Sequence, residues 1–294
     1  MMMALKLFEN VILLLKMNKY TVCKICEGEI KLINKKYNLI QCSNCEFIFC
    51  STIFSQDQFI AVYDELYNKE NAIYRNHAVV EYAMLLENKK IKVGYHRSRL
   101  LKKHVLNGKC ESVLEIGSGI GLIGSYIRNE NKQIKYLGIE IDKESYQKSQ
   151  FLKLNTINDD FTVIDTIEES FDVIMLWEVI EHLQDLRLFL ELANKKLNSN
   201  GKILLSTPNY NKIYNYPERE EDAIFQDKPP VHLNFFTKEN IASIFELNHF
   251  VKCKATVKKF PYLDIKNKKF YIDFLKSIFN HYHGSTIYLE ATKE

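Results

Sequence analysis

A glycine-rich turn between an apolar strand and a helix most restricts how this chain of 294 residues can fold. Residues 113–124 read VLEIGSGIGLIG, so Gly117, Gly119 and Gly121 come at or just after the end of an apolar run. Glycine in such a pattern lets the backbone turn tightly and lie close to another group. Because open α/β sheets bind ligands where a strand ends and the next helix begins, the turn predicts a ligand site.

Strands and helices are expected to alternate after Cys110. The predicted elements are strand 112–117, helix 121–130, strand 135–141, helix 143–154, strand 171–177, helix 185–197 and strand 202–208. This alternation predicts an α/β fold with a doubly wound, mostly parallel sheet and right-handed crossovers. Residues 250–259 and 285–293 alternate with period two and predict a final antiparallel pair at the sheet edge.

Two cysteine pairs near the N-terminus predict a metal site. They form the pattern C-x2-C-x15-C-x2-C, made by Cys23, Cys26, Cys42 and Cys45. Each pair can place two thiolates on a tight turn, and two such turns complete a tetrahedron around Zn²⁺. We therefore predict a small zinc ribbon with structural Zn²⁺ over residues 18–55, and we expect Cys50 to be a core residue.

The remaining chain is divided into three units. Residues 1–17 form an N-terminal extension, interpreted as an over-predicted start before Met17; the alternative is an amphipathic helix at a membrane surface. Helical apolar spacing predicts a helical linker over 56–106, and residues 107–294 form the α/β domain. A net charge of +3 does not indicate a nucleic-acid binder, and the apolar run near the N-terminus is too short to span a bilayer. We expect a cytoplasmic protein without a transmembrane segment.

The glycine turn fits one cofactor pattern better than another. Counted from Gly117, the dinucleotide pattern G-x-G-x-x-G fails, because Leu122 takes the third glycine position. Acidic-x-Gly-x-Gly-x-Gly fits instead, and its acid is Glu115. With this pattern the chain resembles class I S-adenosylmethionine-dependent methyltransferases from about residue 95 onward. Residues 171–185, 196–209 and 231–250 resemble later segments of that family. The resemblance implies a Rossmann-like, seven-stranded sheet.

The same resemblance implies the residues that hold S-adenosylmethionine. The loop of Glu115, Gly117, Gly119 and Gly121 would curl under the methionine part. Glu140 ends the next strand, where an acid can accept hydrogen bonds from both ribose hydroxyls. Asp160 and Phe161 are candidates for the adenine contact, or alternatively for a helix cap. Glu178 would contact the cofactor or the loop backbone.

Two histidines are candidates for a general base. Methyl transfer from a sulfonium is an in-line displacement, so the protein mainly aligns the acceptor and excludes water. A hydroxyl acceptor also needs a base, and histidine suits neutral pH. His182 and His232 both follow strands at the carboxyl edge. An alternative, from resemblance to quinone-ring O-methyltransferases, is a divalent metal at Glu178, Glu181 and His182.

The acceptor is expected to be a small hydroxylated molecule, most plausibly a sugar or nucleotide sugar. Residues 208–236 are rich in tyrosine, asparagine and phenylalanine, which suit a sugar ring, and they include an acidic run at 218–222. The ribbon followed by Tyr63, Tyr67 and Tyr74 resembles enzymes of bacterial glycan pathways. The alternatives are an RNA methyltransferase whose ribbon recognises RNA and a non-catalytic cofactor-binding module. Nucleic acid is disfavoured because the ribbon has no histidine among its ligands.

Overall fold

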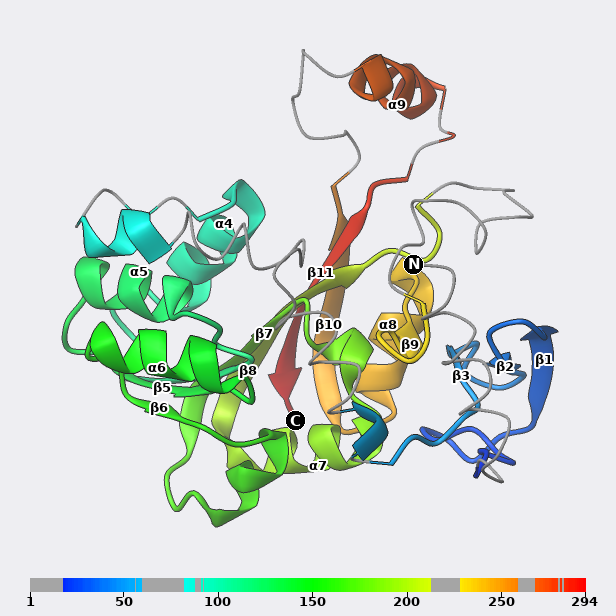
Figure 1. The fold of residues 1–294 in the computed structure, drawn as a ribbon, viewed down its shortest axis with the longest axis horizontal. Coiled ribbons are helices and arrows are strands. Elements are labelled where there is room, and N and C mark those ends of the chain that lie inside the picture. Colours follow the sequence, from blue (N-terminus) through cyan, green and yellow to red (C-terminus); the bar gives the residue numbers. More distant parts are fainter. Residues whose placement is uncertain are drawn as a thin grey trace.

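Two β-sheets organise the chain (Figure 1). The structure, a computed structural model, describes residues 18–55, 57–59, 82–87, 91, 93–212, 228–258, 268–279, 281 and 283–294. Within these ranges, no helix is both long enough and apolar enough to span a membrane. The predicted extension 1–17 lies outside the described residues, as does most of the linker with its three tyrosines. Tyr214, Tyr216, Phe225 and the acidic run 218–222 lie outside them too.

The larger sheet has seven strands in the order β10-β11-β8-β7-β4-β5-β6. Its strands are β4 (Ser112–Ile116), β5 (Lys135–Ile139), β6 (Thr156–Ile157), β7 (Phe171–Trp177), β8 (Leu197–Pro208), β10 (Phe250–Val257) and β11 (Thr286–Lys293). The five strands from β8 to β6 pair in parallel, whereas β11 is antiparallel to both of its neighbours. The predicted Rossmann-like, mostly parallel sheet is confirmed, and so is the antiparallel pair, although β11 lies inside the edge.

Helices follow the strands as the alternation predicts. They are α4 (Tyr95–His104), α5 (Leu122–Glu130), α6 (Lys143–Phe151), α7 (Leu186–Lys196), α8 (Lys238–Glu246) and α9 (Lys268–Ile278), with short 3-10 helices at Phe161–Thr166 and Ile180–His182. Side-chain caps fix several starts, since Asp142 accepts from Ser145 N and Asp185 from Leu188 N. A capping box between Thr237 and Asn240 begins α8.

Strand β8 begins earlier than predicted. The sequence predicts a turn at 198–201 and a strand from Lys202, but β8 already starts at Leu197. Asn200 has a φ of 60°, and the pairing with β7 shifts between Phe171 and Val173. The expected turn is therefore an irregularity within the strand.

The smaller sheet joins the cysteine-rich segment to the α/β domain. It consists of β1 (Ile30–Asn34), β2 (Leu39–Cys42), β3 (Ile48–Cys50) and β9 (Asn234–Phe235), all antiparallel. Strands β1 and β2 form a hairpin around the polar residues 35–38. However, β9 comes from the segment after β8, and the sequence analysis did not predict that it would complete the ribbon sheet.

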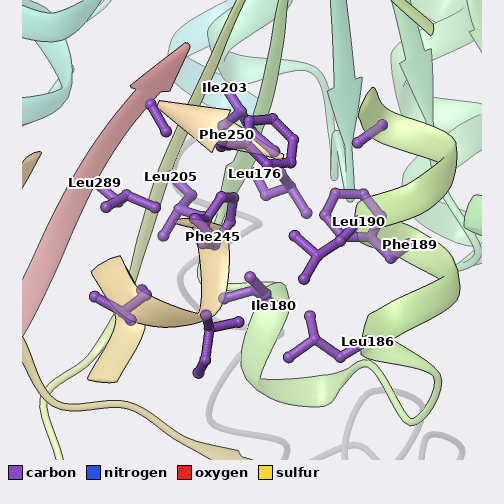
Figure 2. Packing of buried hydrophobic residues seen from close by; sticks show 14 of the residues in the cluster. Leu176, Ile180, Leu186, Phe189, Leu190, Ile203, Leu205, Phe245, Phe250 and Leu289 are labelled. Atoms are coloured by element: carbon purple, nitrogen blue, oxygen red, sulfur yellow. The ribbon is translucent and has the colours of Figure 1, made fainter. Parts of the chain in front are cut away.

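Buried side chains cover both faces of the larger sheet. On one face, residues of β7 and β8 pack against α7 and α8, as Figure 2 shows for Leu176, Leu205, Phe189 and Phe245. The ribbon adds to this same cluster, and the ring of its Phe47 stacks 5.6 Å from Phe236. The opposite face holds a second cluster, which includes residues of α4 and α5. The ribbon is therefore packed as part of the main core.

Candidate active site

The glycine turn leaves β4 at the carboxyl edge of the sheet. Gly117, Gly119 and Gly121 have φ values of 68°, 54° and 87°, in the left-handed region that favours glycine. A Cβ at Gly117 would lie 2.5 Å from Val179, and one at Gly121 would lie 2.2 Å from Leu154. A Cβ at Gly119 would meet no described atom within 4 Å. Gly119 therefore borders open space, whereas its two neighbours are held by packing.

Glu140 follows β5 and faces the same turn. Its Oε2 accepts from Gly119 N at 2.6 Å, and its Oε1 accepts from Asp142 N at 2.7 Å. Burial raises the pKa of Glu140 to about 7, although the amide donors oppose that rise. Each carboxylate oxygen can accept a further hydrogen bond, so Glu140 can receive two hydroxyls from a ligand beside Gly119.

Glu115 lies under the turn, as the acidic-x-Gly pattern predicts. Tyr136 OH donates to Glu115 Oε2 at 2.6 Å, and burial raises the pKa of Glu115 to about 8. The Tyr136 ring fits because residue 124 is glycine, where a Cβ would lie 2.6 Å from the ring. Gly124 thus serves the packing of α5 on β5, and the glycine that borders open space is Gly119.

A charged cluster that sequence reasoning missed lies at the end of β7. Ser206 Oγ donates to Glu178 Oε1 at 2.6 Å, and Arg97 Nη2 lies 3.6 Å from the same oxygen. The Arg97 guanidinium also lies 5.5 Å from the centre of the Trp177 ring. Glu178 has a φ of 58°, and partial burial raises the pKa of its carboxyl. Arg97 belongs to α4, in the segment interpreted only as a linker, and no local pattern distinguishes it from Arg99.

The two adenine candidates have structural partners at the end of β6. Asp160 accepts from Thr162 N at 2.7 Å and caps the 3-10 helix that begins at Phe161. The Phe161 ring meets Phe189 edge-on at 5.8 Å. Asn158 donates to the Glu140 carbonyl at 2.8 Å, which holds this strand end beside β5. Asp160 thus takes the cap role that the sequence left open, close to the Glu140 end of β5.

The two candidate bases lie side by side. The ring centres of His182 and His232 are 4.8 Å apart. His182 Nδ1 also lies 2.8 Å from the carbonyl oxygen of Val231, which is 49 residues away in the sequence. A carbonyl only accepts, so Nδ1 carries the hydrogen and Nε2 carries the lone pair. Glu181 Oε1 lies 4.0 Å from Nε2. Burial and the neighbouring His182 lower the pKa of His232 to about 3.

The trio of Glu178, Glu181 and His182, considered above as an alternative metal site, is not a cluster of possible ligands among the described residues. Glu181, His182 and His232 are the group whose ligand atoms lie within 4.8 Å of one another. Glu178 is directed to Ser206 and Arg97 instead. Glu178 precedes the short 3-10 helix at 180–182, and its side chain does not lie beside that of Glu181. Any metal at this place would therefore be bound through His232 rather than Glu178.

Similarity to known proteins identifies the family of this chain. The family model of the methyltransferase domain matches residues 86–252, which are more than half of the chain. The chain belongs to the methyltransferase-domain family. The crystal structure of a SAM dependent methyltransferase from Archaeoglobus fulgidus superposes with a TM-score of 0.54 at 17% identity and covers 80% of this chain and 99% of that chain. That likeness confirms the fold.

Two curated relatives are similar over shorter stretches. The ubiquinone biosynthesis O-methyltransferase of Pelagibacter ubique (strain HTCC1062) is 26% identical over 129 residues, covering 40% of this chain and 53% of the relative. The (S)-coclaurine N-methyltransferase of Papaver somniferum is 28% identical over 102 residues, covering 32% of this chain and 29% of the relative. The chain therefore spans 53% of the length of the first relative and 29% of the length of the second.

Four cysteines of the ribbon form one cluster, made by Cys23, Cys26, Cys42 and Cys45. Their sulfurs lie within 4.8 Å of one another, with Cys23–Cys45 at 3.7 Å and Cys26–Cys42 at 3.5 Å. Tetrahedral zinc with Zn–S bonds of about 2.3 Å places sulfurs about 3.8 Å apart. Backbone amides point at the sulfurs, with Asn44 N donating to Cys42 Sγ at 3.3 Å. The arrangement fits a zinc ion. Cys50 lies outside the group and is buried, as predicted.

Hydrogen bonds connect the ribbon to the two backbone segments that carry His182 and His232. Cys50 N donates to Leu233 O, and Leu233 N donates to Glu181 O, both at 2.8 Å. Asn234 Nδ2 donates to Ile180 O and Leu183 O and so closes around the 3-10 helix that carries His182. Gln184 exchanges two hydrogen bonds with the backbone of Phe54. Ribbon strand β3 and the His182 helix therefore hold segment 231–235 from both sides.

Proposed function

We propose that the chain transfers a methyl group from S-adenosylmethionine to a small hydroxylated acceptor, most plausibly a sugar or sugar derivative. One observation carries the proposal, the juxtaposition of the open side of Gly119 with the Glu140 carboxylate across two neighbouring strand ends. A ribose fits there because both Glu140 oxygens can accept its hydroxyls. Membership of the methyltransferase-domain family supports the same cofactor.

The proposed cofactor contacts follow from charge. The cofactor supplies an activated methyl group on a sulfonium sulfur. Arg97 can pair with the carboxylate of its methionine part, and the carboxyl of Glu115 or Glu178 can accept a hydrogen bond from the ammonium. The Trp177 Nε1 atom is buried without a hydrogen-bond partner among the described residues, which is consistent with a missing polar ligand beside Arg97. Asp160 and Phe161 border the adenine end.

His182 is the better of the two candidate bases. Its Nε2 carries the lone pair and its side chain is 19% exposed, whereas His232 is held neutral by burial. In the proposed step the acceptor hydroxyl gives its proton to His182 Nε2 as the oxygen–carbon bond forms and the sulfur–carbon bond breaks. Glu181 stabilises the imidazolium that results. His232 limits water and positions the ring of His182.

A sugar acceptor is supported by the polar groups around the end of β8. Asn209 and Asn211 lie there with Tyr210, whose ring packs on Phe235 at 5.8 Å. The two curated relatives are named for methylation at oxygen and at nitrogen, and neither name includes a sugar. The sugar is therefore proposed from the side chains of this chain and from its ribbon. The ribbon is proposed to hold structural Zn²⁺ at its four cysteines.

Labelled methyl transfer tests the proposal. The purified protein is incubated with methyl-labelled S-adenosylmethionine and with separate metabolite and RNA fractions of the native host. We expect label in the small-molecule fraction, and labelling about a hundredfold slower when His182→Gln replaces the wild-type protein. Label in RNA would support the RNA methyltransferase instead. Normal cofactor binding with no labelled product in either fraction would contradict an enzyme and support the non-catalytic module.

A further inference from the structure

A second group of possible metal ligands lies on the acceptor side, apart from the four cysteines. Within the part of the chain that the structure describes, Glu181, His182 and His232 each offer one ligand atom, and these atoms lie within 4.8 Å of one another. Glu181 Oε1 and His182 Nε2 are 4.0 Å apart. One carboxylate and two imidazoles are a donor set that binds divalent transition ions, as in zinc sites with two histidines and one glutamate.

The spacing of the three ligand atoms is close to what a bound ion requires. Bonds of about 2.1 Å to nitrogen and oxygen place tetrahedral ligand atoms about 3.4 Å apart. The 4.0 Å between Glu181 Oε1 and His182 Nε2 is wider by only about 0.6 Å, which side-chain rotation can supply. Hydrogen bonds that these atoms make without the ion are exchanged for bonds to it, as happens when cysteine thiols bind zinc.

Hydrogen bonds already orient two of the three ligands. The carbonyl oxygen of Val231 accepts from His182 Nδ1 at 2.8 Å, which leaves the lone pair on Nε2. Thr207 Oγ1 donates to Glu181 Oε2 at 3.0 Å, so the other oxygen, Oε1, is the one directed to His182. Metal-binding histidines and carboxylates are usually held in this way by a further hydrogen-bond partner, which increases their affinity for the ion.

The surroundings of the trio favour a doubly charged ion. The side chain of Glu181 is 2% exposed, and a carboxylate that is removed from water is costly unless hydrogen bonds or a cation stabilise it. The side chain of His182 is 19% exposed, so an ion can reach the group from solvent. Because Mg²⁺ prefers oxygen ligands whereas Zn²⁺ binds imidazole, the two histidines favour Zn²⁺ and similar ions.

We propose that Glu181, His182 and His232 form a second metal site, which binds Zn²⁺ or a similar divalent transition ion and inhibits methyl transfer. The ion uses the lone pair of His182 Nε2, to which the acceptor proton moves in the proposed reaction. His182 therefore cannot accept that proton while the ion is bound. The binding of the ion does not rest on the proposed function, whereas the inhibition does, since it requires His182 as the base.

Equilibrium dialysis with Zn²⁺, followed by atomic absorption, tests the site. Wild-type protein should bind a tight ion at the ribbon cysteines and a weaker second ion at the trio, and Mg²⁺ should not compete for the second ion. His232→Gln should keep the ribbon ion and bind the second at least about tenfold more weakly. Thr207→Val keeps all three ligands and should weaken the second ion about tenfold, because Glu181 loses its partner. His249→Gln, whose side chain is 83% exposed in wild type, should bind both ions normally.

Methyl transfer at increasing Zn²⁺ concentrations tests the inhibition. Filling of the second site should lower the wild-type rate at least about tenfold, because the base is lost. Removal of the weaker ion by gel filtration should restore the rate. Thr207→Val should need about tenfold more Zn²⁺ for the same fractional loss, whereas His249→Gln should match wild type.

The metal site would be overturned if wild-type protein bound no zinc beyond the ribbon ion, or if His232→Gln bound the second ion as tightly as wild type. The ribbon ion retained in each variant shows that the variant is folded. An unchanged rate with the second site filled would overturn the inhibition. Wild-type protein that transfers no methyl group even without the second ion would contradict the proposed function alone, because the zinc count still decides the site.

Discussion

The two sides of the candidate active site are built in different ways. The cofactor side comes from one strand, the turn after it and the next strand, and its contacts use backbone amides, as between Gly119 and Glu140. The acceptor side is assembled from the His182 helix, segment 231–235 and ribbon strand β3. The comparison teaches that a local motif can specify the cofactor side, whereas the acceptor side depends on a distant unit that zinc is proposed to stabilise.

Removal of one zinc ligand should give the largest difference between the two sides, because it should damage the acceptor side and leave the cofactor side intact. Cys42→Ser should lower the zinc content and reduce turnover at least about a hundredfold, because β3 no longer holds β9 and His182. The dissociation constant for S-adenosylhomocysteine should change by less than about threefold. Metal analysis, turnover and calorimetry measure these effects. Cys253→Ser, at a half-buried position outside the cluster, is the control. Equal loss of turnover and cofactor affinity would show that the two sides are not separable.

Replacement of the proposed base should affect the acceptor side alone. His182→Gln should lower kcat about a hundredfold and leave cofactor affinity unchanged, because Gln keeps a donor for Val231 O but cannot take the proton. His249→Gln, whose side chain is 83% exposed in wild type, is the matched control. Steady-state kinetics on the labelled acceptor measure the change. Equal rates in the two variants would exclude His182 as the base.

A side chain at Gly119 should affect the cofactor side alone. Gly119→Val must adopt a φ of 54° and fill the open space, so cofactor affinity should fall about thirtyfold. Gly94→Val is the matched control, because Gly94 also has no described neighbour within 4 Å but has a φ of −53°. Calorimetry measures affinity, and thermal unfolding should show a loss of about 1–2 kcal/mol for Gly119→Val. Retained affinity would contradict the loop assignment.

The smallest effect concerns the pH dependence of stability. Burial raises the pKa of Glu115 from 4.5 to about 8, so the folded protein keeps a proton that the unfolded chain releases. This carboxyl therefore lowers the free energy of unfolding as pH rises from about 5 to 8. Glu115→Gln should remove that loss. Between pH 5 and pH 8, its free energy of unfolding should therefore rise by about 2 kcal/mol relative to that of wild type. Thermal unfolding at several pH values measures it. If the free energies of unfolding of wild type and Glu115→Gln changed with pH in parallel, the pKa of Glu115 would not be raised in the folded protein.

Local sequence patterns predicted most of the strands and the turn that form the proposed cofactor side. The Gly117–Gly121 spacing, the strand before it and the position of Glu140 were all readable, because each depends on short-range geometry. The cysteine spacing likewise predicted the sulfur cluster. These features depend on few contacts between distant residues, so the sequence alone is enough to predict them.

The acceptor side was not predictable in the same way. Strand β9 has two residues and therefore shows no alternating pattern, yet it completes the ribbon sheet. The pairing of His182 with His232 and the position of Arg97 also depend on how distant segments pack.

Calorimetry with the natural cofactor product tests the central claim most directly. Titration of wild-type protein with S-adenosylhomocysteine should show saturable binding, and Glu140→Ala should weaken it about tenfold through loss of the ribose contacts. NAD and NADP should show no heat of binding. Tight binding of either dinucleotide, together with no response to S-adenosylmethionine or S-adenosylhomocysteine, would contradict the account.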